Sequence, residues 1–264
     1  MSAWMLSAEV SEEFHAPGPA DFEFPPIFGA DGFLTKPMLI IIVGTALIAL
    51  LFYLATRRAG VVPGKLQFAG EGVYGFVRNQ IAADAIGREG IKYVPYLATL
   101  FVFIAVLNVA GIVPFAQFPA TSRIAIPLFL AVISWVIFNY VGIKRQGFGG
   151  YFKNMLFPPG VPKAIYPLLS PIEFMSTVVF RPITLTLRLT FNMFAGHLVL
   201  LLCILGGEFL LFEVQGVIGF AAGGVAMLFG IVMTFFEGFI QLLQAYVFTL
   251  LSAVYIGGAL THEH

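Results

Sequence analysis

Five long apolar runs alternate with shorter, more polar segments along the chain. A run of about 20 apolar residues is what an α-helix needs to cross the hydrocarbon core of a bilayer. We therefore expect five transmembrane helices, at residues 37–56, 93–114, 124–143, 171–205 and 226–259. The last two runs exceed the minimum length, so we expect these helices to be long, tilted and packed as an antiparallel hairpin.

The segment at residues 64–92 has a different pattern. Apolar side chains recur in it at helical spacing, at Leu66, Val73, Val77 and Ile81. Polar or charged side chains fill the positions between them, at Gln67, Glu71, Arg78, Asp84 and Arg88. A segment with this many charges is too polar to cross a bilayer, and its pattern is typical of an amphipathic helix lying on the membrane surface.

The N-terminal segment, residues 1–36, contains several acidic residues with Pro and Gly between them. The acidic residues include Glu9, Glu12, Glu13, Asp21 and Glu23. The segment lacks the basic region followed by an apolar stretch that is typical of a signal peptide. We expect an exposed acidic segment here, followed by a single membrane domain at residues 37–264.

Composition supports an all-α membrane protein. The chain is 59% hydrophobic and 11% charged, with a mean hydropathy of +0.94. Soluble domains average about 45–50% apolar and about 25% charged residues, so a soluble fold has no place for this much apolar surface. The net charge of zero argues against nucleic acid as a partner. The single cysteine, Cys203, lies in an apolar run, and we interpret it as a buried hydrophobic residue.

Lysine and arginine predict the orientation in the membrane. They gather in two loops that five spans place on the same side: Arg57, Arg58, Lys65, Lys92, Lys144, Arg145 and Lys153. Cytoplasmic loops carry an excess of Lys and Arg, so this side is expected to be cytoplasmic. The acidic N-terminus and the loop with Glu208 and Glu213 then lie outside, and the C-terminus lies inside.

Polar residues form a stripe on the first long helix. Thr177, Arg181, Thr184, Arg188 and Asn192 follow one another at steps of three or four residues. A charge at the centre of a bilayer helix costs about 2.5–3.5 kcal/mol on insertion scales. Arg181 is close enough to the cytoplasmic end to reach the interface with its long side chain. Arg188 lies deeper, so its position requires a functional reason.

A second polar stripe lies on the last helix, at Thr234, Glu237, Gln241, Gln244 and Tyr255. An antiparallel register that sets Arg188 beside Gln244 also sets His197 near Glu237 and Thr177 near Tyr255. The alternative interpretation is that these groups only hold the helices together by hydrogen bonds. This structural interpretation is as good as a functional interpretation for four of the residues: Thr177, Thr184, Thr234 and Gln241. It is weaker than the functional interpretation for Arg188, His197 and Glu237 taken together.

His197 raises a geometric difficulty. It lies nine residues after Arg188, which on a straight helix points it to the opposite side. Either the two residues have different roles, or Gly196 permits a local distortion of the helix.

Two motifs carry a resemblance to a known family. RPITLTLRLTFNMFAGH (Arg181 to His197) and IQLLQAYVFTLLSAVY (Ile240 to Tyr255) resemble subunit a of F-type ATP synthases. The likeness extends over nearly the whole chain, including VPGK after the first span, LNVAGIVP (Leu107 to Pro114) and the final THEH.

The resemblance implies a role for each matching residue. In that family the arginine that matches Arg188 faces a rotating ring of c subunits, each with one carboxylate in the membrane, and two offset aqueous half-channels end near it. The chain would be a non-catalytic stator subunit beside b-type peripheral stalk subunits, in a bacterial-type plasma membrane. Asn192 matches the family's polar residue one helical turn after the arginine. Gln244 matches the family's glutamine that faces the arginine.

The half-channels are assigned by the same resemblance. His197 and Glu237 match an acid–histidine pair of the outer half-channel, in the reverse order to some relatives. Glu173 is a candidate for the inner half-channel. Further candidate lining residues are Asn108, Thr184, Glu208, Glu213, Gln241 and Tyr255. Gly111 is a departure, because the well-studied bacterial pattern has an aspartate there.

Other functions remain as alternatives. A stand-alone cation or proton transporter also uses intramembrane Arg, Glu and His, and a structural membrane subunit would tolerate changes at Arg188. The chain has no GxxxxGK[ST] loop, so we expect no ATPase site within it. We also expect no catalytic triad, cofactor or metal site. The ion, a proton or a sodium ion, would be selected mainly by the c subunit.

Overall fold

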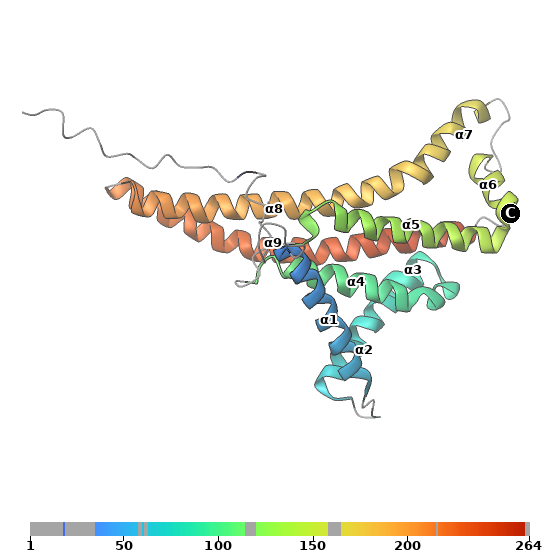
Figure 1. Ribbon diagram of the computed structural model, residues 1–264, viewed down its shortest axis with the longest axis horizontal. Helices are drawn as coiled ribbons and strands as arrows, with labels where there is room; N and C mark the ends of the chain where they lie inside the picture. Colours follow the sequence, from blue (N-terminus) through green and yellow to red (C-terminus); the bar gives the residue numbers. More distant parts are fainter. Residues whose placement is uncertain are drawn as a thin grey trace, which may run out of the picture. The chain divides into compact units, whose positions relative to one another are not determined.

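The computed structural model describes residues 18, 35–57, 60, 63–113, 120–157, 165–214 and 216–261. Within these ranges nearly all residues are helical and there is no β-strand (Figure 1). The basic residues Arg58 and Lys163, together with His262 and His264, lie outside the described residues, and so does almost all of the acidic segment predicted at residues 1–36.

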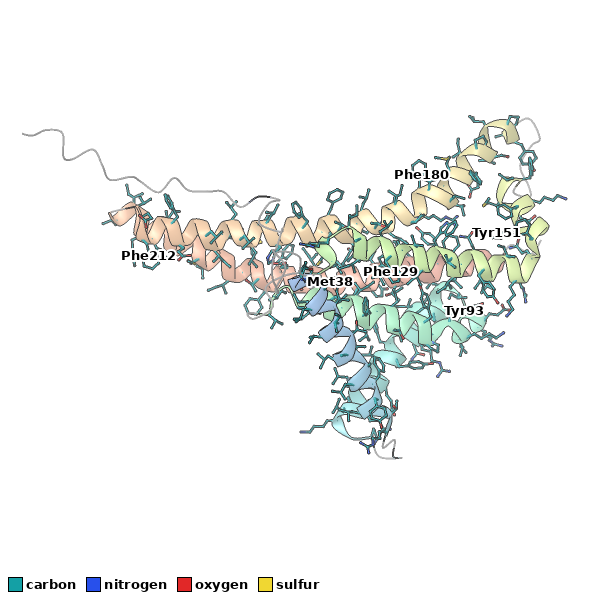
Figure 2. The ribbon with its side chains drawn as sticks, viewed as in Figure 1. Met38, Tyr93, Phe129, Tyr151, Phe180 and Phe212 are labelled. Carbon is teal, nitrogen blue, oxygen red and sulfur yellow. The ribbon has the colours of Figure 1, made fainter. Side chains whose placement is uncertain are left out.

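Five helices in the described part of the chain are long and apolar enough to cross a membrane: Pro37–Arg57, Arg88–Val109, Ala125–Gln146, Tyr166–Phe212 and Val217–Leu260. This confirms the all-α membrane class. The first three contain α1 (Lys36–Arg57), α4 (Val94–Val109) and α5 (Ala125–Gln146). Apolar side chains project outward from the helices, among them Phe180 and Phe212 (Figure 2), which are both exposed. Such a surface requires an apolar surrounding.

The predicted surface helix at residues 64–92 is divided into several pieces. These are α2 (Lys65–Phe76), the π-helical turn η2 (Val77–Ala82), α3 (Ala83–Ala85) and the 3₁₀ helix η3 (Arg88–Tyr93). Gly87 has a φ of +82°, which a glycine adopts without steric cost and which ends the helix. The apolar positions Val77 and Ile81 are completely buried, as their spacing predicts. Whether the segment lies on the membrane surface stays a prediction.

The loop predicted after α5 contains a further helix, α6 (Phe148–Leu156). Lys144 and Arg145 belong to the last turn of α5, and Lys153 lies in α6. Tyr151 packs against Gly142, where a Cβ atom would lie 2.6 Å from its ring Cδ2. The absence of a side chain at Gly142 therefore permits α6 to fold back on α5, which sequence spacing does not reveal.

The last two helices are longer than the predicted ranges 171–205 and 226–259. The first consists of α7 (Tyr166–Met175), the π-helical turn η6 (Ser176–Phe180) and α8 (Arg181–Phe212), and the second is α9 (Val217–Thr261). At about 1.5 Å per residue, helices of 47 and 44 residues measure roughly 65–70 Å, about twice the roughly 30 Å of hydrocarbon. They are too long to cross along the membrane normal, which agrees with the expected tilt.

The glycine-rich segment between these spans is mostly helical, and the expectation of a loop there was wrong. A Cβ atom at Gly207 would lie 3.1 Å from Met227 Cγ, and one at Gly223 only 2.6 Å from Leu211 Cγ. Small residues permit helices to pack this closely in membrane proteins. The glycines therefore serve helix packing, and the chain reverses direction in a short turn that includes Gly216, whose φ is +110°.

Cys203 lies on α8 in the same region and is less enclosed than its apolar surroundings in the sequence suggest. Its side chain is half-buried and forms no disulfide. A Cβ atom at Gly230 on α9 would lie 3.5 Å from the Cys203 Cβ, so the cysteine packs against a glycine of the neighbouring helix. The interpretation as a small hydrophobic residue agrees with this contact, but the expectation of full burial was wrong.

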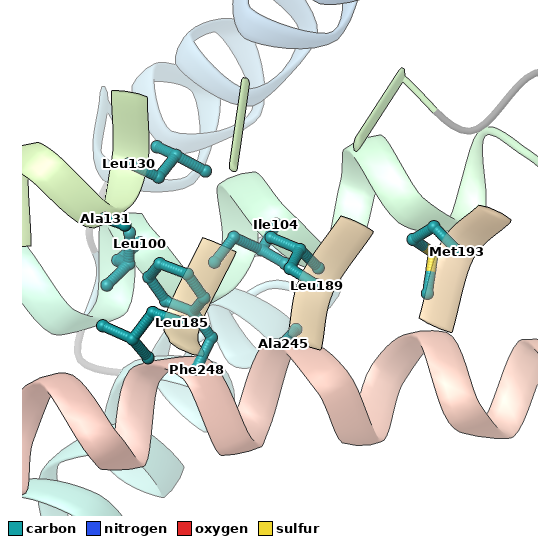
Figure 3. Packing of buried hydrophobic residues seen from close by; sticks show 9 residues of the cluster. All are labelled: Leu100, Ile104, Leu130, Ala131, Leu185, Leu189, Met193, Ala245 and Phe248. Atoms are coloured by element: carbon teal, nitrogen blue, oxygen red, sulfur yellow. The ribbon is translucent and has the colours of Figure 1, made fainter. Parts of the chain in front are cut away.

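The described chain forms two compact units, and the boundary between them falls within α8 and α9. The smaller unit contains Phe194–Ile240, and the larger contains Pro37–Met193 and Gln241–His264. In the core of the larger unit, Leu185 and Leu189 of α8 and Phe248 of α9 meet Leu100 and Ile104 of α4 (Figure 3). This packing positions α8 and α9 around Arg188 and Gln244.

Candidate functional site

The smaller unit brings together a histidine and a glutamate. His197 Nδ1 on α8 lies 3.9 Å from Glu237 Oε1 on α9, and the two side chains are only 7% and 5% exposed. Gly196 lies next to the pair, and a Cβ atom there would make an ordinary contact with Glu237 Cγ at 3.6 Å. The sequence predicted this pairing from the antiparallel register, and the structure confirms that the two residues are neighbours.

The helix carrying His197 shows no local distortion. α8 is a regular α-helix from Arg181 to Phe212, so it passes through Gly196 without a break. That Arg188 and His197 have different roles stays a prediction.

In the larger unit, Arg188 lies on an exposed face of α8 with Thr184 and Asn192 one turn to either side. Asn192 Nδ2 donates a 2.8 Å hydrogen bond to Gln244 Oε1 on α9. Gln244 is buried, and its Nε2 has no hydrogen-bond acceptor among the described residues. The hydroxyl of Thr184 bonds back to its own helix at the Phe180 carbonyl, which agrees with the purely structural interpretation for that residue.

The polar stripe predicted on the first long helix is not continuous. Thr177 is buried and Arg181 is partly buried, whereas Thr184, Arg188 and Asn192 are exposed. For Thr177 one reason is the π-helical turn at Ser176–Phe180, which contains it, holds more residues per turn and so rotates it relative to the positions that follow. Sequence spacing alone assumed an uninterrupted α-helix.

The pairing between α8 and α9 also differs from the predicted register. The guanidinium of Arg181, and not Thr177, lies over the ring of Tyr255, 5.1 Å from its centre. Asn192, one turn after Arg188, provides the hydrogen bond to Gln244. Both observed pairs are displaced by about one helical turn from the predicted register. Arg181 does not simply extend to the interface either, because it also lies over Phe138, 5.7 Å from the ring centre.

Glu173 lines a small cavity in the larger unit. The cavity has a volume of about 100 Å³, and its polar lining consists of Gln146, Tyr151, Asn154, Glu173, Thr177 and Arg181. A water needs only about 10–15 Å³ on this measure, so a polar space of this size admits several. Arg181 Nη2 lies 3.9 Å from Glu173 Oε1. Burial raises the pKa of the Tyr151 phenol, while the Arg181 charge lowers it by a smaller amount.

Asn108, expected to line a half-channel, is instead buried and bonds to Gln241 on α9 and to Thr121. It is fully buried, its Nδ2 donates to the Gln241 carbonyl at 3.2 Å, and its Oδ1 accepts from the Thr121 hydroxyl at 2.6 Å. Gly111 is also buried, in the turn after α4, and its N–H donates to the Asn108 carbonyl at 2.8 Å. No acidic side chain is supplied at this place.

The two remaining acids are not brought to the pair. Glu208 lies within α8, about three helical turns beyond His197, and Glu213 lies in the turn that follows. Both are exposed. The expectation that they share a loop is therefore wrong for Glu208, because the glycine packing described above extends the helix past it.

Sequence reasoning missed several residues around the cavity. Gln146 Nε2 donates to the Ala259 carbonyl, and Asn154 Nδ2 donates to Gln146 Oε1, so α6 is linked to the ends of α5 and α9. The polar residues within the segment Phe148–Leu156 were the available signal. Among the described residues no group of three or more His, Cys, Asp or Glu side chains is arranged to hold a metal ion.

Comparisons with known proteins agree with the resemblance in the sequence. The family model described as ATP synthase A chain matches residues 38–257. ATP synthase subunit a of a Nocardioides species is 47% identical, covering 100% of this chain and 99% of the relative. The subunit a of Frankia alni is 45% identical and covers 100% of this chain and 92% of the relative. The subunit a of Streptomyces lividans is 44% identical and covers 95% of this chain and 89% of the relative. The chain therefore belongs to the ATP synthase A chain family, whose curated members are subunit a of ATP synthase.

Proposed function

We propose that this multi-pass membrane protein is the proton-conducting stator subunit of an F-type ATP synthase. Two aqueous half-channels deliver protons to, and remove them from, the carboxylates of a rotating c-ring. Arg188 prevents direct flow between them, so that proton movement requires rotation and is coupled to ATP synthesis. The subunit itself is not catalytic, and the ATP chemistry takes place on other subunits.

The observation that carries this proposal is the situation of Arg188. It lies in a membrane-spanning helix on an exposed face, and the part of the chain that the structure describes places no carboxylate within ion-pair distance of it. A charge in a bilayer requires a partner or water. An exposed guanidinium of this kind fits a carboxylate that is supplied by a neighbouring subunit, as the c-ring would.

The chemistry of arginine then explains the barrier. A guanidinium is effectively never deprotonated, so Arg188 cannot pass a proton on. Its fixed charge favours the ionised form of a carboxylate that comes near. A carboxylate of the c-ring therefore releases its proton on approach and takes up another from the opposite half-channel after passing. Asn192 and Gln244 support this face, because their hydrogen bond joins α8 to α9 one turn from Arg188.

His197 and Glu237 form the proton-relaying pair of the outer half-channel in this proposal. Histidine is the side chain whose unperturbed pKa is closest to neutrality, and a carboxylate 3.9 Å away permits exchange through a small movement or one water. Gln241 and Asn108 lie on the route only as buried structural groups, and Glu208 and Glu213 are exposed candidates for its entrance. Glu173 and its cavity belong to the inner half-channel.

Orientation and partners follow from the same interpretation. Basic residues at the ends of α1 and α5 support a cytoplasmic location for those ends, with the N-terminus outside and the C-terminus inside, in a bacterial-type plasma membrane. The partners are the c-ring, b-type stalk subunits and the rest of the ATP synthase, together with protons and the lipid bilayer. Nucleic acid is not expected.

A cross-linking experiment tests this function. Cys203 is replaced by Ala, Arg188 by Cys, and a second cysteine is placed one turn from the c-subunit carboxylate, all in the assembled complex in membranes. We expect a disulfide between the two subunits, and none when the cysteine replaces Phe129 on α5. A subunit that purifies without a c-ring and transports ions alone would instead support a stand-alone transporter. Normal ATP-driven pumping after Arg188→Ala would support a purely structural subunit.

A further inference from the structure

Arg181 is a second, partly buried cation in the membrane region that the mechanism above does not use. It begins α8 immediately after the π-helical turn η6. Its guanidinium carbon lies 5.1 Å from the ring centre of Tyr255 on α9 and 5.7 Å from that of Phe138 on α5. Aromatic faces attract a cation at such distances, and the two rings, whose centres lie 5.7 Å apart, belong to two different helices.

The backbone that leads into Arg181 is also fixed. A π-helical turn leaves its carbonyls without the regular i+4 donors, and here the Trp135 indole Nε1 on α5 donates a 3.2 Å hydrogen bond to the Thr177 carbonyl. The turn is thus bonded to the same helix that provides Phe138. Helix α5 therefore contacts both the turn that precedes Arg181, through Trp135, and the Arg181 guanidinium, through Phe138.

The Arg181 guanidinium lies next to the Glu173 carboxylate. The pair is separated by 3.9 Å, and the side chains of Arg181 and Glu173 are 30% and 38% exposed. Both line the polar cavity together with Tyr151 and Thr177. A carboxylate that is partly exposed has many rotamers open to it, and a fixed positive charge at the cavity wall selects those that point toward it.

We propose that Arg181 is a positioning residue of the inner half-channel: the rings of Phe138 and Tyr255 hold its guanidinium, and the guanidinium holds the Glu173 carboxylate at the cavity wall. This inference rests on the proposed function, in which the cavity belongs to the inner proton path. Arginine itself transfers no proton. A lysine fits this place poorly, since the planar guanidinium stacks on rings in a way an ammonium does not.

The experiment reads the local charge with thiol reagents instead of proton pumping. Cys203 is replaced by Ala and Glu173 by Cys in the assembled complex in inverted vesicles, which expose the cytoplasmic face. The rates of modification by an anionic and a cationic methanethiosulfonate are then compared. Their ratio cancels changes in the reactivity of the thiol itself, so it reports the electric potential at position 173 and not general damage to the fold.

With Arg181 present we expect the anionic reagent to be preferred by about tenfold, and this preference to disappear in Arg181→Gln. Replacing both Phe138 and Tyr255 by Leu should remove most of it while the charge is retained. Phe129→Leu, the same change at an exposed ring on α5, should leave the ratio unchanged. A ratio that Arg181→Gln or the double ring variant does not alter overturns the positioning role while the aqueous path stands.

Failure of the proposed path has a separate signature. The thiol introduced by Glu173→Cys would then react with neither reagent in any variant, while the thiol of a Lys153→Cys variant, at an exposed position on α6, reacts with both. Such a result means that water does not reach the cavity. It overturns both the assignment of the inner half-channel to this cavity and the positioning role that depends on it.

Discussion

Exchanging His197 and Glu237 tests whether these two residues act as one unit. Three variants are required: His197→Glu, Glu237→His, and the swap that combines the two changes. The swap keeps one histidine and one acid at the same place on α8 and α9, whereas each single change removes one of them.

The distance and burial set the expected size of the effect. Opposite unit charges 3.9 Å apart attract by about 4 kcal/mol at an effective dielectric constant of about 20. Removal of one member of a buried ion pair typically costs about 3–5 kcal/mol of stability. A positioned acid or base contributes about 10²–10⁴-fold to a proton transfer, so each single change should slow proton relay by at least about a hundredfold.

The swap should retain much more activity than either single variant. Residues in direct contact show coupling energies of about 0.5–3 kcal/mol in double-mutant cycles, so we expect the swap to exceed the additive expectation by about twofold or more. The assay is ATP-driven quenching of a pH-sensitive dye in inverted vesicles, normalised to the amount of assembled complex. Equal loss in all three variants would refute the reasoning, because it would show that the residues contribute independently.

Three further predictions concern the larger unit. Arg188→Ala should abolish ATP-driven pumping in the same vesicles, and Arg188→Lys should fail or nearly fail, because an ammonium does not reproduce the guanidinium. Asn192→Ala should destabilise the subunit by about 1–3 kcal/mol in thermal unfolding of the purified complex, because buried Gln244 loses its donor. Gly142→Ala should cost about 1–3 kcal/mol in the same assay, because the new methyl group overlaps the Tyr151 ring.

Each of these has a contrary outcome. Near-normal pumping with Arg188→Ala would exclude the proposed barrier. An Asn192→Ser variant, which retains a donor, should lose less stability than Asn192→Ala, and equal losses would show that the hydrogen bond is not the cause. Gly149→Ala on α6 is the control for Gly142, since a Cβ atom there meets nothing within 4 Å. If both glycine variants unfold alike, close packing against Tyr151 is not the cause.

Helix number and membrane class were accessible from the sequence, because each depends on local composition. A run of apolar residues crosses a bilayer whatever it packs against, so residues 37–56 and 124–143 predicted α1 and α5 closely. The glycine-rich segment between the last two spans was misinterpreted for the opposite reason. Gly207 and Gly223 are compatible with a loop or with tight helix packing, and only the neighbouring helix decides between them.

The candidate site, too, was predictable from the sequence only in part. The sequence alone determined which residues carry unusual chemistry, because a charge such as Arg188 within an apolar run is costly wherever the helix lies. It also predicted that His197 faces Glu237, since an antiparallel register relates distant positions by simple addition along regular helices. The same addition missed by about one helical turn elsewhere, because Asn192 bonds to Gln244 and Arg181 lies over Tyr255.

Only the tertiary structure decided which side chains meet around Arg181, Gln244 and Glu173. It placed Arg181 over the rings of Phe138 and Tyr255, joined Gln244 to Asn192 by a hydrogen bond, and brought Glu173 to a cavity that α6 helps to line. These contacts join residues far apart in the chain through ring faces, single hydrogen bonds and a missing side chain at Gly142. Such contacts depend on distances of a few ångströms between helices, which no periodicity along one helix encodes.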